Sequence, residues 1–230
     1  GTGFILFLMA IACIDDKKYG RAATPLFLMS SLLQPSGIFV MLKEYSSGGD
    51  PHYGVMFMAV IMLIQHGAVL IAKKRTTLAF TSIVFGSILF MTLFDLWKMD
   101  KDLIGTVAGT SLHCIAYAAN NSRHAAIAPF WYFIGSGTLL GAVFDAVEST
   151  SVEPAYLGLT AFTVFLSTYV RSRTLLLTGT LAMICYIGYF TEKHFAHTLG
   201  WPLLLIIGGM GLIGLSALAV KINNKYIKQP

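Results

Sequence analysis

Nine long apolar runs dominate this 230-residue chain and constrain its fold more than any other feature. They cover residues 1–14, 24–42, 55–72, 77–97, 103–119, 127–147, 155–170, 174–190 and 202–220. A helix that crosses a bilayer needs about 20 residues and accepts about 17. In hydrocarbon, every backbone N–H and C=O must be paired within its own segment, which leaves helices for runs of this length. The pattern predicts an all-α, polytopic membrane bundle of about nine transmembrane helices.

The low content of charged residues supports this prediction. They make up 12% of the chain, whereas a soluble domain is about 25% charged. The first run would span only about 21 Å as a helix, so we expect this helix to be incomplete and to continue upstream of Gly1. The polar connections are short, so we expect one transmembrane domain over residues 1–230, in contact with the lipid bilayer.

The basic residues predict an orientation, because loops on the cytoplasmic side of a membrane are enriched in Lys and Arg. With nine helices, 12 of the 16 basic residues fall on one side. These are Lys17, Lys18, Arg21, Lys73, Lys74, Arg75, Arg123, Arg171, Arg173, Lys221, Lys225 and Lys228. We therefore expect the N-terminus of the sequence outside the cell and its C-terminus in the cytoplasm. The basic charge is explained by topology, so nucleic-acid binding is not predicted.

Charged residues also recur at intervals of about 50 residues, and this spacing has two explanations. The series are Arg21, Arg75, Arg123 and Arg173, and Glu44, Asp95, Asp145 and Glu192. One explanation is a two-helix repeat, made of an outward helix, a short loop and an inward helix, as some transporters use. The other is geometric, since two helices with short loops and the positive-inside rule give a similar period without a true repeat.

Two histidines are predicted to lie inside the membrane. Gln65 and His66 lie about two-thirds of the way along one apolar run, and His113 lies at the same relative depth in the next inward run. Ionisable side chains are costly there, which makes them functional candidates. Two imidazoles at equal depth could relay protons or contact a solute, or could ligate a metal or haem iron. Alternatively, each could be a neutral histidine hydrogen-bonded across a helix interface.

Other polar residues are candidates for a substrate or ion pathway. Asp95 and Asp145 each follow a phenylalanine near the outer end of a run, where they either line an outer vestibule or are solvated at headgroup level. Gln34 lies next to Pro35, which is expected to kink its helix and free backbone carbonyls. Broken helices of this kind line some transporter sites, although the kink could serve packing alone.

The last outer loop offers a weaker metal site. His194 and His197 are spaced as neighbours on a helical turn and could bind a metal ion, but no fourth ligand is evident beside Glu192. No nucleophile elbow, phosphate loop, His-Glu-x-x-His motif or paired Cys-x-x-Cys is present in the sequence. The sequence therefore does not predict an enzyme, and we expect no bound cofactor unless the histidines hold one.

Small residues predict close contacts between helices. Gly105 and Gly109 form one small-xxx-small motif, and Gly137 and Gly141 form another. In membranes, such motifs let two helix backbones approach closely. We therefore expect these four glycines to serve helix packing.

The C-terminal part carries a resemblance to known proteins. It runs from Ser172-Arg173-Thr174-Leu175 through Tyr186-Ile187-Gly188-Tyr189-Phe190 to Leu199-Gly200-Trp201-Pro202-Leu203 and a glycine-rich helix that ends at Lys221. This stretch resembles a group of polytopic bacterial membrane proteins whose domain has no assigned function. The resemblance implies a bacterial inner-membrane protein and implies no activity.

Three function classes follow from these observations. The first is a transporter or channel-like protein for a small solute or ion, which would use the intramembrane histidines. The second is a non-catalytic subunit of a larger membrane complex, or a homo-oligomer, which would use the small-residue faces. The third is a membrane redox protein, in which His66 and His113 would hold a cofactor.

Overall fold

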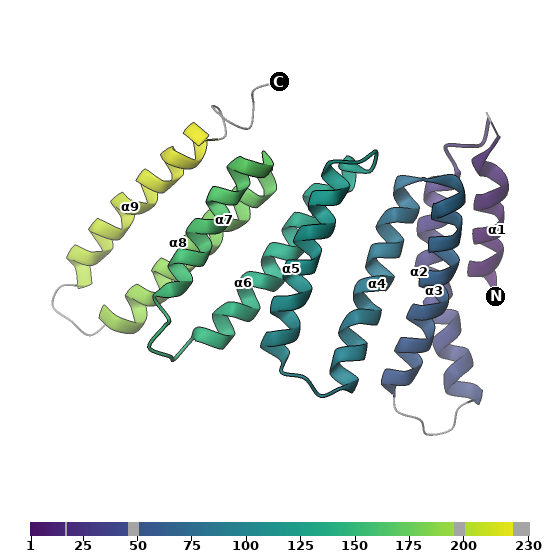
Figure 1. The fold of residues 1–230 in the computed structure, drawn as a ribbon, viewed down its shortest axis with the longest axis horizontal. Helices are drawn as coiled ribbons and strands as arrows, with labels where there is room; N and C mark the ends of the chain where they lie inside the picture. The colour runs from purple at the N-terminus through teal and green to yellow at the C-terminus, as the bar shows by residue number, and fades with distance from the viewer. Residues whose placement is uncertain (17, 46–50, 196–200, 223–230) are drawn as a thin grey trace. The chain divides into compact units, whose positions relative to one another are not determined.

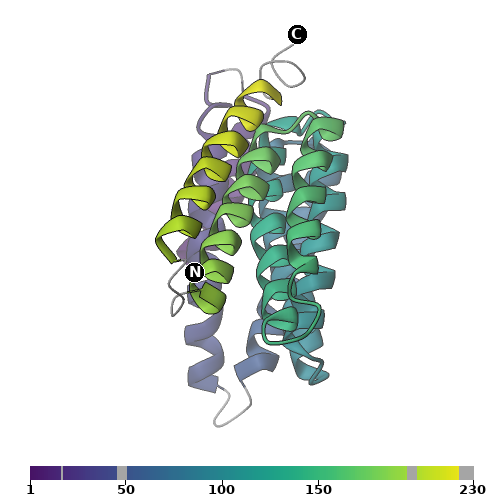
Figure 2. The same ribbon diagram turned by 90° about the vertical axis from the view of Figure 1, so that its left-hand side faces the viewer.

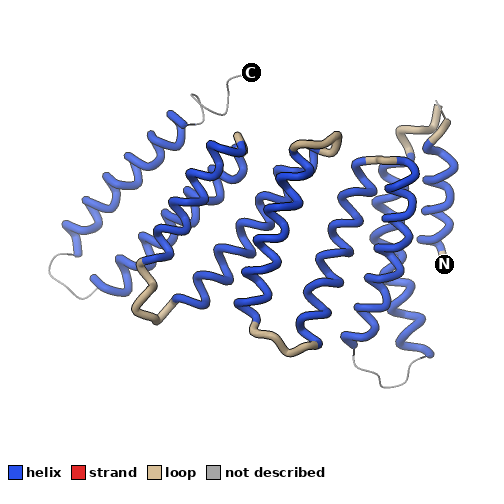
Figure 3. The backbone as a smooth tube through the Cα atoms, viewed as in Figure 1, coloured by secondary structure: helices blue, strands red, loops and turns tan. Residues whose placement is uncertain are grey.

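The computed structural model describes residues 1–16, 18–45, 51–195 and 201–222. The described residues form helices, turns and loops, with no strand among them (Figures 1 and 3). The α-helices of this described part are α1 Thr2–Ile14, α2 Ala23–Tyr45, α3 Pro51–Lys73, α4 Thr76–Leu96, α5 Lys101–Asn120, α6 Ala128–Val147, α7 Ala155–Val170, α8 Arg173–Phe195 and α9 Trp201–Ile222. A short 3₁₀ helix, η1 Ala125–Ile127, precedes α6.

Each predicted apolar run corresponds to one of these helices, so the all-α prediction is confirmed. The helices extend beyond the runs where polar residues can stabilise a helix end. Asp100, for example, caps α5 because its Oδ1 accepts a hydrogen bond from the backbone N–H of Asp102 at 2.8 Å. Capping of this kind satisfies a backbone donor that has no partner within the helix. As a result, α5 begins two residues before its apolar run.

Length and apolar composition identify the chain as an integral membrane protein. Within the described residues, five helices are long and apolar enough to cross a bilayer, while α1 and α7 are shorter apolar helices. These five spans are Ala23–Leu42, Pro51–Lys73, Thr76–Leu96, Ala125–Val147 and Arg173–His194.

The distribution of side chains fits contact with lipid. Large apolar side chains face outward, as Phe165 (67% exposed) and Ile71 (78% exposed) do. Small hydroxyl residues are fully buried between helices instead, including Ser30, Ser136 and Ser167. Water would favour the reverse arrangement, because large apolar side chains are the ones most often buried in soluble proteins. In lipid, small and hydroxyl-bearing residues favour helix contacts.

The contacts divide the chain into two compact units, Gly1–Met99 and Asp100–Pro230. In the first unit, α1 packs against α2 and α3 packs against α4. In the second unit, α5 packs against α6 and α7 against α8, and α8 also contacts α6 and α9. Figure 2 shows α8 and α9 lying side by side. The single domain over residues 1–230 stays a prediction.

The two-helix repeat stays a prediction, and the most closely packed hairpins are built around the basic turns. Each pair of tightly packed helices is joined by a turn rich in basic residues, whereas the proposed unit joined its helices through an outer loop. Two of the basic turns are very short. In each of them one residue, Lys74 (φ 51°) or Arg171 (φ 56°), adopts a left-handed conformation, and the chain reverses its direction there. The short turns hold each helix against the next one. The packing unit is therefore the hairpin around a basic turn.

Glycine allows the closest approach within these hairpins. A Cβ atom built on Gly109 of α5 would lie 2.6 Å from the backbone nitrogen of Leu139 in α6. Gly105, one turn earlier, faces Ala142 of α6 in the same way. Gly137 and Gly141 lie on another face of α6, are exposed, and would have no other atom within 4 Å of an added Cβ. The first predicted motif thus lies in the α5–α6 contact, and the second faces outward from the described residues.

Candidate functional site

His66 lies at a junction of three helices in the first unit. It belongs to α3, and its ring lies between Phe7 of α1 and Phe85 of α4, with ring centroids 5.0 and 5.5 Å apart. The residue is fully buried. Its Nδ1 lies 2.9 Å from the carbonyl oxygen of Met62, one turn earlier in α3. A carbonyl oxygen can only accept a hydrogen bond, so Nδ1 carries the proton. In the neutral ring, Nε2 is therefore the acceptor.

The Nε2 atom of His66 has no hydrogen-bond partner among the described residues. The neighbouring Gln65 also has a buried side-chain nitrogen, Nε2, without a partner there. An unpaired polar atom buried in an apolar environment costs roughly 1–3 kcal/mol. Two such atoms on consecutive residues therefore form the least satisfied polar position of the described α3. A free imidazole nitrogen can accept a proton, a hydrogen bond or a metal ion.

His113 repeats part of this geometry in the second unit, but both of its ring nitrogens are engaged. Nδ1 lies 2.8 Å from the carbonyl oxygen of Gly109, one turn earlier in α5. Nε2 lies 3.1 Å from Oγ of Ser136 in α6. With Nδ1 protonated, Nε2 accepts a hydrogen bond from the Ser136 hydroxyl group. Gly135 leaves room for the ring, because a Cβ there would lie 3.1 Å from Nδ1 of His113. His113 thus links α5 to α6, and its functional role stays a prediction.

The two histidines belong to different units, so each is a separate candidate. The residues that the structure describes include no group of three or more His, Cys, Asp or Glu side chains that could hold a metal ion. Histidine ligation of a haem or metal by His66 and His113 stays a prediction. His66 is the one with a free nitrogen, which makes it the stronger candidate for a functional role.

Gln34 lies in a satisfied network rather than an open site. Its Nε2 donates to the carbonyl oxygen of Gly3 at 3.1 Å and to Oγ of Ser30 at 2.9 Å. Ser30 donates to the same carbonyl oxygen at 2.9 Å. Pro35 lies inside α2, which continues past it from Ala23 to Tyr45. Gln34 therefore joins α1 to α2.

The predicted outer carboxylates are exposed. Asp95 pairs with Nε2 of His52 at 2.8 Å, and about half of each side chain is accessible. Asp145 is also exposed. Such pairs contribute little to stability, because solvent screens them. Each aspartate lies near the C-terminal end of its helix, and its place in an outer vestibule or at headgroup level stays a prediction.

The weaker metal site is only partly described. His194 lies at the end of α8, where its Nδ1 is 3.1 Å from the carbonyl oxygen of Phe190 and its ring stacks on that of Phe190 at 4.2 Å. His197 lies outside the described residues. Glu192 is exposed. A metal site at these residues stays a prediction.

A polar network in the second unit, where the connection between α6 and α7 meets α8, was not predicted. Glu153 is 4% exposed, and its Oε2 accepts from Nζ of Lys193 at 2.8 Å. Lys193 also donates to the hydroxyl of Tyr189 at 3.0 Å, and Tyr189 donates to Glu148 at 2.9 Å. The hydroxyl of Tyr186 donates to the Glu153 carbonyl oxygen at 2.9 Å.

The residues that α8 contributes to this network could have been predicted from their spacing in the sequence. Tyr186, Tyr189 and Lys193 are spaced three and four residues apart, which places their polar groups on one face of α8. Nothing comparable marks Glu153, which lies in the connection between α6 and α7. Only the fold of that connection brings its carboxylate to α8. The network fastens the connection to the helix.

The comparisons with known proteins give no relative: no protein-family model, no curated protein and no solved structure matches this chain. The resemblance to bacterial membrane proteins of unassigned function stays a prediction that rests on the residues quoted for it.

Proposed function

We propose that this chain is a nine-span transport protein of the bacterial inner membrane that moves a small ion or solute, with protons as its simplest cargo. The observation that carries the proposal is the free Nε2 of His66, a buried acceptor inside a span that is apolar enough to cross the bilayer. Ionisable groups at such positions are costly and commonly mark ion or substrate pathways. A neutral imidazole with one free nitrogen can take up and release a proton.

The surroundings of His66 support a gated pathway rather than an open one. Phe7, which contacts His66, belongs to a buried apolar cluster that extends to Ile14 at the basic end of α1. Along the helix these two residues are separated by about 10 Å. The cluster keeps water from reaching the imidazole from that side. Transport would require these side chains to move apart, as alternating access demands.

We further propose that the basic turns face the cytoplasm. In this orientation, the turns that join the packed hairpins lie on the side where Lys and Arg are enriched. The N-terminus of the sequence would be outside and its C-terminus inside. The cytoplasmic ends of the hairpins would then meet the anionic headgroups of the inner leaflet.

Proton flux into proteoliposomes tests the role of His66. A potassium gradient with valinomycin sets the voltage, and a pH-sensitive dye inside the vesicles reports proton entry. The change is His66→Gln, with His113→Gln as the matched control, since both nitrogens of His113 are already bonded. We expect His66→Gln to lower the voltage-driven flux by about tenfold or more, because it removes the titratable group. His113→Gln should keep most of the flux.

Two outcomes would contradict this proposal. One is wild-type flux no higher than that of empty vesicles. The other is an equal loss in both variants, each checked to be monodisperse in detergent. Either result would favour the second candidate, a subunit of a membrane complex. That candidate rests on Gly137 and Gly141, whose outward face on α6 leaves room for another helix.

The redox alternative would use the same free nitrogen of His66. A haem bound there would give a Soret absorbance band in the purified chain. The flux measurement separates this alternative from transport, because a redox protein needs no voltage-driven proton entry.

A further inference from the structure

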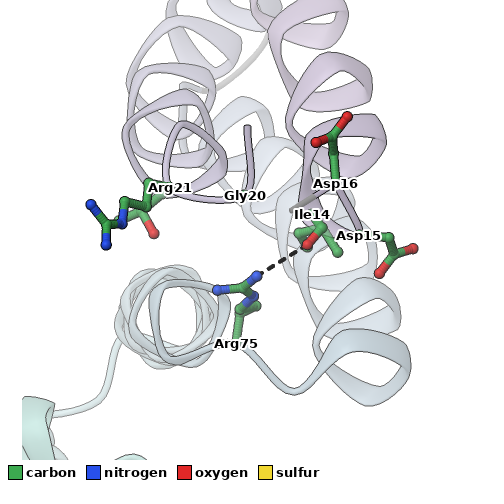
Figure 4. A pocket seen from close by; sticks show the side chains of 7 residues that line it. Ile14, Asp15, Asp16, Gly20, Arg21 and Arg75 are labelled. Atoms are coloured by element: carbon green, nitrogen blue, oxygen red, sulfur yellow. Dashed lines mark hydrogen bonds between the residues drawn. The ribbon is translucent and has the colours of Figure 1, made fainter. Parts of the chain in front are cut away.

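Two cavities in the first unit are lined in part by residues of α2. The first is at the basic end, has a volume of about 540 Å³, and is lined by Asp15, Asp16, Arg21, Thr24 and Arg75 (Figure 4). The second has a volume of about 450 Å³ and lies further along α2, where residues of α4 also line it. Its lining includes Leu28, Leu32 and Pro35 of α2, and Thr81, Phe85 and Ile88 of α4.

The first cavity offers positive charge to a ligand. Nη2 of Arg75 donates to the carbonyl oxygen of Ile14 at 3.1 Å, which holds its guanidinium at the cavity (Figure 4). Arg21 lines the same cavity and has no ion pair among the described residues. An arginine guanidinium presents several N–H donors that match the geometry of a phosphate group.

The two acidic residues of this cavity are already engaged. Asp15 pairs with Nζ of Lys73. Oδ1 of Asp16 accepts from the backbone N–H groups of Lys18 and Tyr19, at 2.7 and 3.3 Å. The carboxylates are therefore held by neighbouring groups on the protein, while the two guanidinium groups remain for an anion.

The second cavity is apolar and opens towards lipid. Leu28 and Leu32 line it and are 39% and 69% exposed. Thr24, Leu28 and Pro35 are spaced by whole turns, so one face of α2 runs from the charged cavity through the apolar one. From Thr24 to Pro35 this face is about 16 Å long. The hydrocarbon of one leaflet has a similar depth, about 15 Å.

We propose that the first unit binds one anionic phospholipid, with its phosphate at Arg21 and Arg75 and an acyl chain along the groove between α2 and α4. Charge at one end and an apolar cavity further along α2 match the two parts of such a lipid, and the face of α2 that joins them is about one leaflet deep. This inference goes beyond transport and does not depend on it. Because Phe85 lines the groove and also contacts His66, an acyl chain there would pack beside the proposed transport residue.

Native mass spectrometry of the full chain in detergent tests this site. The probes are phosphatidylglycerol and phosphatidylcholine with identical acyl chains. An arginine near an anionic lipid contributes roughly fivefold to the binding affinity. Arg21→Gln should therefore lower the affinity for phosphatidylglycerol by about that factor. The double variant Arg21→Gln with Arg75→Gln should lower it by about 30-fold. Arg123→Gln, in a basic turn of the second unit, should leave it unchanged. Val84→Trp should weaken the binding of both lipids, because the larger side chain fills the groove that Val84 lines.

Arg21→Gln keeps the test decisive even if the Arg75 variant folds poorly, because the Arg21 side chain forms no ion pair that would hold the described fold together. Equal binding of the two lipids would overturn the proposal, as would an Arg123→Gln loss equal to that of Arg21→Gln. Release of all bound lipid by excess inorganic phosphate would assign the charged cavity to free phosphate instead, and would also overturn it. His66→Gln should bind lipid like the wild type. Lipid binding and proton flux are therefore tested by different variants, and a failure of the transport proposal would not change the expected lipid binding.

Discussion

Replacing Gly109 with alanine should lower the free energy of unfolding by about 1 to 3 kcal/mol, the usual cost of overpacking a tight contact. The new Cβ would lie 2.6 Å from the backbone nitrogen of Leu139 and 2.7 Å from its Cα. These are backbone atoms, so no side-chain rotation can relieve the clash. Helices α5 and α6 would have to move apart along their whole contact. The hydrogen bond between Nε2 of His113 and Oγ of Ser136, which crosses this contact, would then also lengthen.

Gly137→Ala is the matched control for this experiment. It makes the same chemical change in the same hairpin, at a position with nothing within 4 Å of the added Cβ. Alanine is a better helix former than glycine by about 1 kcal/mol, so this variant should be as stable as the wild type or slightly more so. Unfolding in mixed micelles titrated with SDS measures both. Equal stability of the two variants would show that α5 and α6 do not pack as described.

Replacing Lys193 with methionine should destabilise the second unit more than replacing Glu153 with glutamine. Glu153 is 4% exposed, and Lys193 is the only cation that pairs with it among the described residues. Without Lys193, a carboxylate would stay buried without a counter-charge, which is more costly than losing the pair altogether. Lys193 is more accessible, so water can solvate it when Glu153 is removed.

A double variant separates the effect of an uncompensated buried charge from the effect of losing a contact. Lys193→Met combined with Glu153→Gln should be more stable than Lys193→Met alone, because no uncompensated charge remains. The same SDS titration gives the order of the three variants. If the double variant is the least stable, the pair acts as two independent contacts and the buried charge is not the cause.

The sequence was sufficient to predict the helices but not their partners. Run length and the demand for backbone pairing in lipid predict a helix such as α4 closely, since Thr76–Leu96 nearly matches the run 77–97. Pairing depends on which connections are tight. The left-handed conformation of Arg171 and the absence of a side chain at Gly109 determine which helices pack together. Neither property follows from hydropathy, so the tight pairing of α5 with α6 and of α7 with α8 could not be predicted from the apolar runs.

The candidate site could be predicted in part. Their position within apolar runs singled out His66 and His113, because polar residues are rare in such runs. What separates the two is the tertiary contact: Ser136 of α6 meets Nε2 of His113, while phenylalanine rings surround His66. Which side chain lies opposite an imidazole depends on the rotation of the neighbouring helix. Glu153 was not predicted for a related reason. It is buried because of how the connection between α6 and α7 folds, which hydropathy does not indicate.

In the topology that we propose, the helices alternate across the membrane, and every basic turn lies on the cytoplasmic side. Labelling of single cysteines by a membrane-impermeant maleimide in intact bacterial cells tests it most directly. In a chain lacking Cys13, Cys114 and Cys185, the probes are Ser122→Cys and Ser172→Cys in basic turns, and Lys101→Cys and Thr150→Cys at the opposite ends. The account predicts labelling at 101 and 150, with labelling at 122 and 172 only after the cells are permeabilised. Labelling at 122 or 172 in intact cells would contradict it.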